Sequence, residues 1–286
     1  MATRELASVD GKVTATREAV LPLPDDGLYR GDGVFEVIRL YAGRPFALAD
    51  HLDRLGRSAA AIDLPLDREG FERDLEPLLA EHGKTAGSTT PGLGSGSASA
   101  SQGDAQLRLI ATRGGRRILL IEPVAPHAES VRVATVTYQP TVILDRVKSL
   151  SYGANMHATR IAKERGADEA VFVTPDGTVL EPPTSTIFWA GADGVLKTPS
   201  LDNPILNSIT RDRLVGALDV AEGIYDSADL ATAAEAFLAS TTREVQPIAA
   251  IDGRALPWPG ARTQEARAAF ERAVSADVGT TAGEPA

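Results

Sequence analysis

The segment Asp145-Arg146-Val147-Lys148-Ser149-Leu150-Ser151-Tyr152 decides how the rest of the chain is interpreted. Lys148 follows an apolar residue and precedes a short predicted helix, so the fold can hold its side chain in a pocket. Removal from water favours the neutral amine of a lysine, which can then attack an aldehyde. The alternative is a solvated surface lysine, the common case for this residue type. The segments that follow decide between these two interpretations.

A carboxylate, Glu181, lies 181 − 148 = 33 residues after the lysine. Between them, 173–179 predicts a strand, a Pro-Asp-Gly turn and the start of a second strand. A helix, a strand and a hairpin turn fit this separation and can bring both side chains to one ligand. Taken alone, Glu181 is equally well an exposed hairpin carboxylate.

Arg54 lies on a predicted helix over about 50–62, beside its apolar stripe and not within it. The stripe consists of residues that recur at intervals of three and four: Leu52, Leu55, Ala59 and Ile62. The planar fork of a guanidinium suits a phosphate group. The alternative is a solvated helix charge.

Two later segments offer further groups for an anion. Leu206-Asn207-Ser208-Ile209-Thr210-Arg211 opens a predicted helix, whose free backbone N–H groups can bind an anion, although Ser208 is also an ordinary N-cap residue. In 237–248, a predicted strand ends in the hydroxyl cluster Ser240-Thr241-Thr242, which by itself indicates only a loop.

Together, in this order, these segments resemble those of the fold-type IV pyridoxal phosphate (PLP) enzymes. That family contains branched-chain and D-amino-acid transaminases and aminodeoxychorismate lyase. The segments are similar to the family's Lys-Ser-Leu-Asn, Glu-Gly-x-x-Ser-Asn-Ile-Phe, His-Leu-x-Arg-Leu, Leu-x-Gly-Ile-Thr-Arg and Ser-Thr-Thr-x-Glu-Val-x-Pro motifs. The chain departs from them at Ser151, Pro182, Pro183, Thr186 and Ser208.

The resemblance implies a role for each matched residue. Lys148 forms the Schiff base with PLP and then acts as the acid and base of the reaction, while Glu181 faces the pyridine nitrogen and keeps it protonated. Tyr152 is expected to bond the phenolic oxygen of the cofactor. The residues expected around the phosphate are Arg54, Ser208, Ile209, Thr210, Thr241 and Thr242.

The run 30–39 resembles the family segment that leads into the substrate strand, whereas its Gly31-Asp32-Gly33 alone indicates only a tight turn. Strand alternation places Phe35, Val37 and Arg39 on one face, which we expect to line the substrate site.

Arg39, Arg108 and Arg113 are candidates for binding a substrate carboxylate. On one continuous strand, Arg108 and Arg113 would point to opposite faces, so at most one is expected in the pocket unless a bulge intervenes. Phe35 with Val37 is typical of D-amino-acid transaminases, whereas Arg108 and Arg113 resemble aminodeoxychorismate lyase.

Composition restricts the class of protein. The 286 residues suffice for two domains, and the net charge of −10 with a pI near 5.0 disfavours nucleic acid and anionic membranes as partners. The chain has no cysteine for a disulfide framework, and its four histidines lack metal-ligand spacing. No signal peptide and no apolar run of about 20 residues is present. We therefore expect a cytoplasmic protein without a metal.

The expected fold class is α+β with α/β character, in the two-domain arrangement of fold type IV. We expect an α+β domain over 1–122, a linker over 123–129, a PLP-binding domain over 130–275 and a flexible tail over 276–286. The Gly/Ser-rich run 85–103 is expected to be a disordered insertion. Helices are predicted near 67–82 and 261–275, and strands over 34–40, 107–112 and 118–121.

The preferred function is transamination between an amino acid or amine and a 2-oxo acid, in a homodimer. The alternative within the family is elimination of pyruvate from aminodeoxychorismate, which begins with the same proton abstraction. A non-catalytic binding protein is a further alternative, because of the departures from the motifs.

Overall fold

The computed structural model describes residues 5–85 and 105–279. The chain divides into two compact units, Met1–Ala125 with Val147–Ser151 and Asp277–Ala286, and Pro126–Arg146 with Tyr152–Ala276. The division after Ala125 falls inside the expected linker 123–129. The lysine segment Val147–Ser151 belongs to the first unit, although it lies within the range expected for the second domain. Nearly all of the expected insertion 85–103 lies outside the described residues.

The first unit contains a six-stranded antiparallel sheet with the order β2-β1-β6-β5-β3-β4. Its elements are β1 (Leu6–Val9), β2 (Lys12–Ala15), η1 (Thr16–Glu18), α1 (Asp26–Arg30), β3 (Gly33–Tyr41), β4 (Arg44–Pro45), α2 (Leu48–Ala61), α3 (Arg68–Thr85), β5 (Ala105–Thr112) and β6 (Arg117–Pro123). The three strands and two helices predicted in this part of the chain are confirmed.

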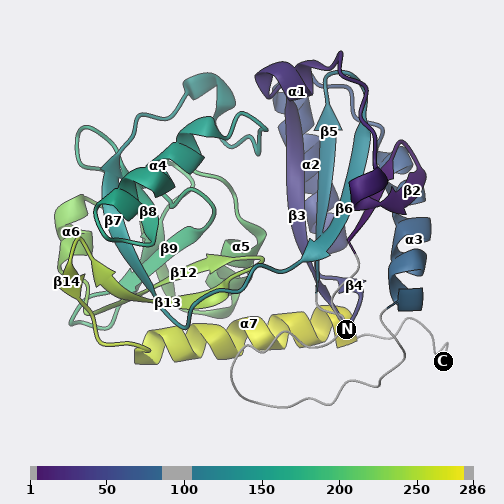
Figure 1. Cartoon of the computed structure of the whole chain (residues 1–286). Coiled ribbons are helices and arrows are strands. Elements are labelled where there is room, and N and C mark those ends of the chain that lie inside the picture. Colours follow the sequence, from purple (N-terminus) through teal and green to yellow (C-terminus); the bar gives the residue numbers. More distant parts are fainter. Residues whose placement is uncertain (1–4, 86–104, 280–286) are drawn as a thin grey trace. The chain divides into compact units, whose positions relative to one another are not determined.

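One face of this sheet forms the core of the unit. Val34, Ile38 and Leu40 of β3 are fully buried there, in one cluster with the apolar residues of α2 and α3 (Figure 1). Their spacing of two and four residues is the strand alternation expected from the sequence. The opposite face of β3 therefore carries Phe35, Val37 and Arg39.

The second unit contains a mixed sheet with the order β11-β10-β9-β12-β13-β7-β8, with β14 paired to β13. Its elements are β7 (Val131–Thr137), η2 (Val142–Leu144), α4 (Gly153–Glu164), β8 (Glu169–Val173), β9 (Thr186–Ala190), β10 (Leu196–Pro199), α5 (Ile209–Ala217), β11 (Val220–Gly223), α6 (Ser227–Ala231), β12 (Glu235–Ser240), β13 (Glu244–Ile251), β14 (Arg254–Ala255) and α7 (Ala261–Gly279). The last three residues of α7 belong to the first unit.

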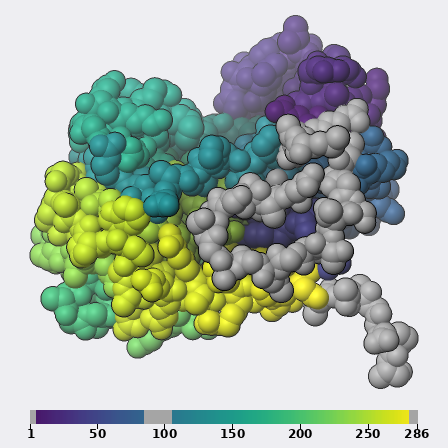
Figure 2. All heavy atoms as spheres, turned by 60° about the horizontal axis from the view of Figure 1, so that its bottom comes forward, coloured from purple at the N-terminus to yellow at the C-terminus, as the bar shows by residue number. Residues whose placement is uncertain are grey.

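Helices cover this sheet where small residues permit close packing. Ala158 and Ala162 of α4 pack against Ala134 of β7 and Ala170 of β8 in one buried cluster. Helix α7 buries Phe270 and binds β13 through Arg267, while its outer side forms part of the surface shown in yellow in Figure 2. No helix in the described ranges is both long and apolar enough to span a membrane.

Two predicted boundaries differ from the structure. Helix α7 continues to Gly279, so residues 276–279, expected in the tail, are helical. The segment after the Pro-Asp-Gly turn forms no named strand but a single bridge between Val173 and Val179, flanked by backbone hydrogen bonds that link Phe172 with Leu180 and Glu181. On its other side the Val179 amide donates to Tyr225 O. The chain at Val179 therefore pairs with a segment far away in the sequence.

Candidate active site

The lysine segment is held against the first residues of β3 by backbone hydrogen bonds. The amide of Phe35 donates to Lys148 O at 3.0 Å, and the amide of Leu150 donates to Gly33 O at 2.9 Å. The backbone amide of Lys148 also donates to Ser58 Oγ of α2 at 3.1 Å. Lys148 Nζ then lies 4.5 Å from the centre of the Phe35 ring. The Lys148 amine thus lies beside Phe35, one of the predicted substrate residues of β3.

Two glycines at the start of β3, Gly31 just before the strand and Gly33 as its first residue, allow this close approach. A Cβ atom at Gly33 would lie 2.4 Å from Ala111 O and 2.7 Å from a methyl group of Leu150. Gly31 has φ +70°, and its carbonyl accepts a hydrogen bond from Ser151 Oγ at 3.2 Å. The Gly-x-Gly run is therefore a tight turn, as predicted, and it also makes room for the lysine segment.

Beneath this face lies a buried charged cluster that we did not predict. Glu36 is fully buried between Val34 and Ile38, and it accepts hydrogen bonds from Arg54 Nε and Nη2, both at 2.7 Å. His51 Nδ1 contacts the same carboxylate at 2.8 Å. A charged residue within the inward-facing apolar positions of a predicted strand was the signal that could have revealed the cluster.

The surroundings of Glu36 and His51 lower the pKa values of both groups. Burial raises the pKa of Glu36, but the charge and hydrogen bonds of Arg54, together with those of His51, lower it to about 2. Burial lowers the pKa of His51, so the ring is neutral at pH 7 and donates its Nδ1–H to Glu36. Arg54, expected beside the apolar stripe of its helix, is instead buried with that stripe. Its role at the phosphate stays a prediction.

The face of β3 opposite to the core brings together four of the five predicted substrate residues. Val37 is paired with Arg108 of β5, so Arg108 shares this face with Phe35 and Arg39. Arg108 Nε contacts Glu122 at 3.4 Å, and its side chain is 30% exposed. Two guanidinium groups, those of Arg39 and Arg108, therefore lie along one face of the sheet.

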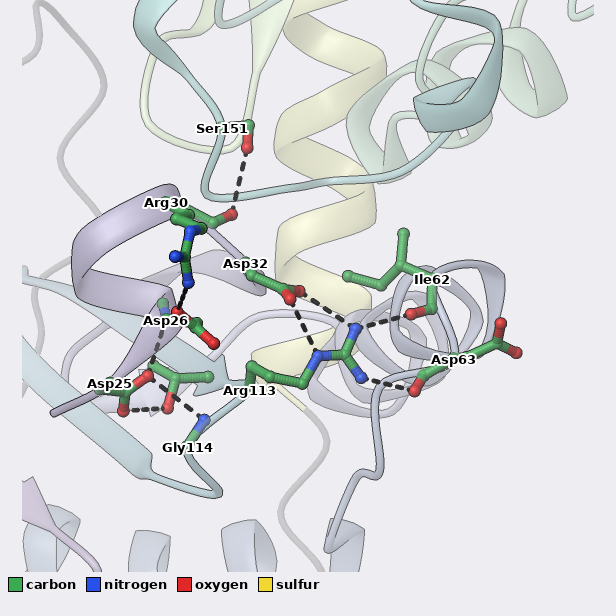
Figure 3. A network of polar contacts seen from close by, with 12 residues as sticks. Asp25, Asp26, Arg30, Asp32, Ile62, Asp63, Arg113, Gly114 and Ser151 are labelled. Atoms are coloured by element: carbon green, nitrogen blue, oxygen red, sulfur yellow. Dashed lines mark hydrogen bonds and ion pairs between the residues drawn. The ribbon is translucent and has the colours of Figure 1, made fainter.

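Arg113 lies just beyond the end of β5, and its guanidinium forms hydrogen bonds with other residues of the first unit. Its Nε and Nη2 bind the Asp32 carboxylate at 3.0 and 3.1 Å, and it also donates to Ile62 O at 2.8 Å and Asp63 O at 2.6 Å (Figure 3). These bonds fix the segment that precedes Gly33. The geometry gives Arg113 a structural role, which favours Arg39 and Arg108 as the carboxylate ligands.

In the second unit, Glu181 is fixed beside the start of α5. Its Oε1 accepts a hydrogen bond from the backbone amide of Leu206 at 3.0 Å. Burial and the nearby Glu181 charge raise the pKa of Tyr138, whose ring is stacked on Phe172 at 4.3 Å. The predicted pyridine partner and the predicted phosphate-binding helix start are therefore neighbours.

At the start of α5, Ser208 acts as the N-cap, because its Oγ accepts a hydrogen bond from the Arg211 amide at 3.3 Å. Thr210 is fully buried, and its hydroxyl has no hydrogen-bond partner among the described residues. The same holds, within the described part of the chain, for the hydroxyls of Ser185 and Thr186. Ser185 and Thr186 were not predicted as site residues, although both lie in the Glu181 motif.

Tyr152, the N-cap residue of α4, donates its hydroxyl hydrogen to Pro183 O at 2.6 Å. Asn155 donates to the same carbonyl at 3.2 Å. The carbonyl of Pro183, one of the two prolines that depart from the family motif, thus accepts hydrogen bonds from two residues at the start of α4. For the predicted bond to a cofactor oxygen, the Tyr152 hydroxyl would have to donate to that oxygen in place of Pro183 O.

The hydroxyl cluster forms the turn between β12 and β13. Ser240 pairs with Glu244 across the two strands, so Thr241, Thr242 and Arg243 make up the connection. Both threonines are half-buried. This turn, the capped start of α5 and its unpartnered buried Thr210 hydroxyl provide donors that fit a phosphate, and Lys148 and Glu181 provide the amine and carboxylate that PLP chemistry requires.

The chain is similar in sequence to known aminotransferases. The family model of class IV amino-transferases matches residues 33–251. A D-alanine aminotransferase of Listeria monocytogenes is 33% identical over 258 residues, which cover 86% of this chain and 87% of the relative. A bifunctional aminodeoxychorismate lyase / D-amino acid transaminase of Mycobacterium tuberculosis is 30% identical over 285 residues, covering 88% and 93%.

The fold is also that of solved transaminases. An aminotransferase of Mycobacterium tuberculosis in a PLP-bound form superimposes with a TM-score of 0.81 at 26% identity, over 95% of this chain and 99% of that chain. Both the sequence and the fold therefore point to the family that the motifs resemble. The chain belongs to the class IV aminotransferases, the enzymes of fold type IV.

Proposed function

We propose that this enzyme is a PLP-dependent transaminase that uses Lys148 to bind the cofactor and to move the substrate proton. The observation that carries the proposal is the placement of Lys148 Nζ, 4.5 Å from Phe35, on the face that also carries Arg39 and Arg108. Two backbone hydrogen bonds of Lys148, to Phe35 and Ser58, and one between Leu150 and Gly33 hold the lysine segment against this strand.

Bound PLP supplies a ring that delocalises the electrons left behind when the substrate Cα–H bond breaks. With the cofactor bound, the Lys148 amine would act as the base that accepts the proton from substrate Cα and as the acid that later gives it back. Glu181, held by the Leu206 amide, keeps a proton on the pyridine nitrogen.

The phosphate is held by the N-terminal amides of α5 at Ile209 and Thr210, with the Thr210 hydroxyl. Ser208 orients these amides by capping the helix. Arg54, whose charge is balanced by Glu36, is expected to contribute hydrogen-bond donors, and Thr241 and Thr242 supply hydroxyls from the turn after β12. This set supplies several directed donors, which the phosphate needs.

The substrates are an amino acid or amine as donor and a 2-oxo acid as acceptor. Phe35 and Val37 limit the side chain of the substrate, while Arg39 or Arg108 binds its carboxylate. We expect a homodimer, as the family resemblance implies, and size-exclusion chromatography with light scattering tests that expectation.

The test is Lys148→Ala, compared with Lys163→Ala, which changes an exposed lysine of α4. We expect Lys148→Ala to lose the visible absorption of the bound cofactor and the transfer of the amino group from D-alanine to 2-oxoglutarate. Lys163→Ala should keep both. Unchanged absorption and activity in Lys148→Ala would overturn the proposal.

Pyruvate elimination from aminodeoxychorismate is the second candidate. Its support is the position of Arg108 on the substrate face and the bifunctional relative from Mycobacterium tuberculosis. Both reactions begin with the same proton transfer by Lys148. Pyruvate released from aminodeoxychorismate, without amino transfer from D-alanine to 2-oxoglutarate, would favour the lyase.

A further inference from the structure

The turn that carries Thr241 and Thr242 contains an arginine whose side chain is only 14% exposed. Arg243 donates from Nη2 to Glu169 Oε2 at 2.7 Å and from Nη1 to Gln246 Oε1 at 2.8 Å. We infer that Arg243 is a positioning residue, which fixes the shape of this turn and thereby sets the affinity of the protein for the phosphate group of PLP. The inference rests on the proposed function.

Both partners of Arg243 are themselves fixed. Glu169 of β8 is 4% exposed at its side chain, and its Oε1 accepts a hydrogen bond from Thr159 of α4 at 2.6 Å. Gln246 of β13 donates to Ala128 O at 2.7 Å. The guanidinium therefore links the turn to β8 and β13 and, through Glu169, to α4. Because Glu169 and Gln246 are held by further hydrogen bonds, they cannot easily move with the turn.

The turn needs such an anchor because its own sequence does not favour its shape. Three residues connect Ser240 to Glu244, and Glu244 has φ +57°, in the left-handed region. Hairpins of this length commonly place glycine at that position, because a side chain there is unfavourable. Inside the turn, the Arg243 amide donates to Ser240 Oγ at 3.3 Å. The Arg243 side chain adds a constraint from outside the turn, through Glu169 and Gln246.

The charge of Arg243 is directed to Glu169 and not to a ligand. Burial lowers the pKa of the Arg243 guanidinium, and the Glu169 charge raises it. A guanidinium that is paired in this way contributes little net positive charge at a distance. Its effect on a phosphate is therefore through the placement of Thr241 and Thr242.

The experiment compares two ligands that differ only in the phosphate. Apo-protein of the wild type and of Arg243→Gln is titrated with PLP and with pyridoxal, which lacks the phosphate, and the visible absorption of each complex is followed. We expect PLP affinity to fall about 10-fold or more in Arg243→Gln, as for the loss of one or two hydrogen bonds to a charged group. Pyridoxal affinity should stay within about 2-fold of the wild type, a change too small to count as a lost hydrogen bond.

Arg132→Gln is the matched control, because Arg132 forms an exposed ion pair with Asp168, next to Glu169 in sequence. It should leave both affinities unchanged. Equal losses for PLP and pyridoxal in Arg243→Gln, or no loss for either, would overturn the inference. If Arg243→Gln does not fold, Arg243→Lys keeps the charge without the fork, and it should show the same selective loss of PLP affinity. A wild type that binds neither aldehyde would instead contradict the proposed function.

Discussion

The Glu36 carboxylate offers a direct test of the buried cluster in the first unit. Glu36→Gln keeps the size of the side chain but removes the charge, and it leaves the Arg54 guanidinium buried without its counter-charge. The pKa of Glu36 falls from its ordinary 4.5 to about 2. That difference, about 2.5 pH units at about 1.4 kcal/mol each, corresponds to about 3 kcal/mol of folding free energy. Removal of one partner of a buried ion pair costs a similar amount, about 3–5 kcal/mol.

The pH dependence has a defined sign. Because the folded pKa of Glu36 lies below its unfolded value, the stabilisation is complete above about pH 4.5 and is lost as the pH falls toward 2. The pKa of His51 is also lowered from 6.5, so acid favours the unfolded state below that pH as well. The difference in stability between the wild type and Glu36→Gln should therefore be largest near pH 7 and shrink between pH 4.5 and 2.

The assay is urea unfolding at a series of pH values, followed by circular dichroism. Glu72→Gln serves as control, since Glu72 is half exposed and pairs with Arg68 at 3.2 Å on the surface of α3. We expect Glu72→Gln to lower the free energy of unfolding by less than about 0.5 kcal/mol. The ion-pair reasoning is refuted if Glu36→Gln lowers the free energy of unfolding by no more than Glu72→Gln does, or if its loss of stability does not become smaller in acid.

Four further substitutions test the site. Gly33→Ala should lower the thermal unfolding temperature and weaken PLP uptake, because its Cβ would lie 2.4 Å from Ala111 O; a variant as stable as the wild type would contradict the close approach. Arg108→Gln should raise KM for the amino acid about 10-fold, as for the loss of a hydrogen bond to a charged group, with little change in unfolding temperature. Arg113→Gln should mainly lower the unfolding temperature. Steady-state kinetics and thermal unfolding measure the two effects, and the reverse result would make Arg113 the substrate ligand and Arg108 the structural residue. Thr210→Val should lower PLP affinity without destabilising the apo-protein, because its buried hydroxyl has no partner in the described structure; calorimetric titration with unchanged affinity would exclude it from the phosphate site.

Local patterns in the sequence were sufficient to predict the secondary structure around the site. The alternation of β3 correctly separated Phe35 from Val34, and the capping signal at Ser208 correctly marked the start of α5. Motif order identified the family, which the comparisons confirm. These features depend on short stretches of chain, whose periodicity and turn chemistry are visible in the residues themselves.

Interactions between distant residues were not predictable in the same way. The pairing of Glu36 with Arg54 depends on the register between a strand and a helix 18 residues later in the chain. Arg113 was placed among the candidate substrate residues because the sequence does not show that Asp32 lies near enough to bind its guanidinium. Glu169 and Arg243 are 74 positions apart, and only the folded sheet brings them together.

The attachment of Val147–Ser151 to β3 has a consequence for how the protein can be divided. A fragment that ends at Ala125 would contain β3 paired with β5, but would leave the first residues of β3 without their second antiparallel neighbour at Ser149. A fragment that starts at Pro126 would contain Lys148 but no strand to hold it. The reactive amine is therefore ordered only when both lengths of polypeptide are present, so cofactor uptake can report on the reassembly of a split chain.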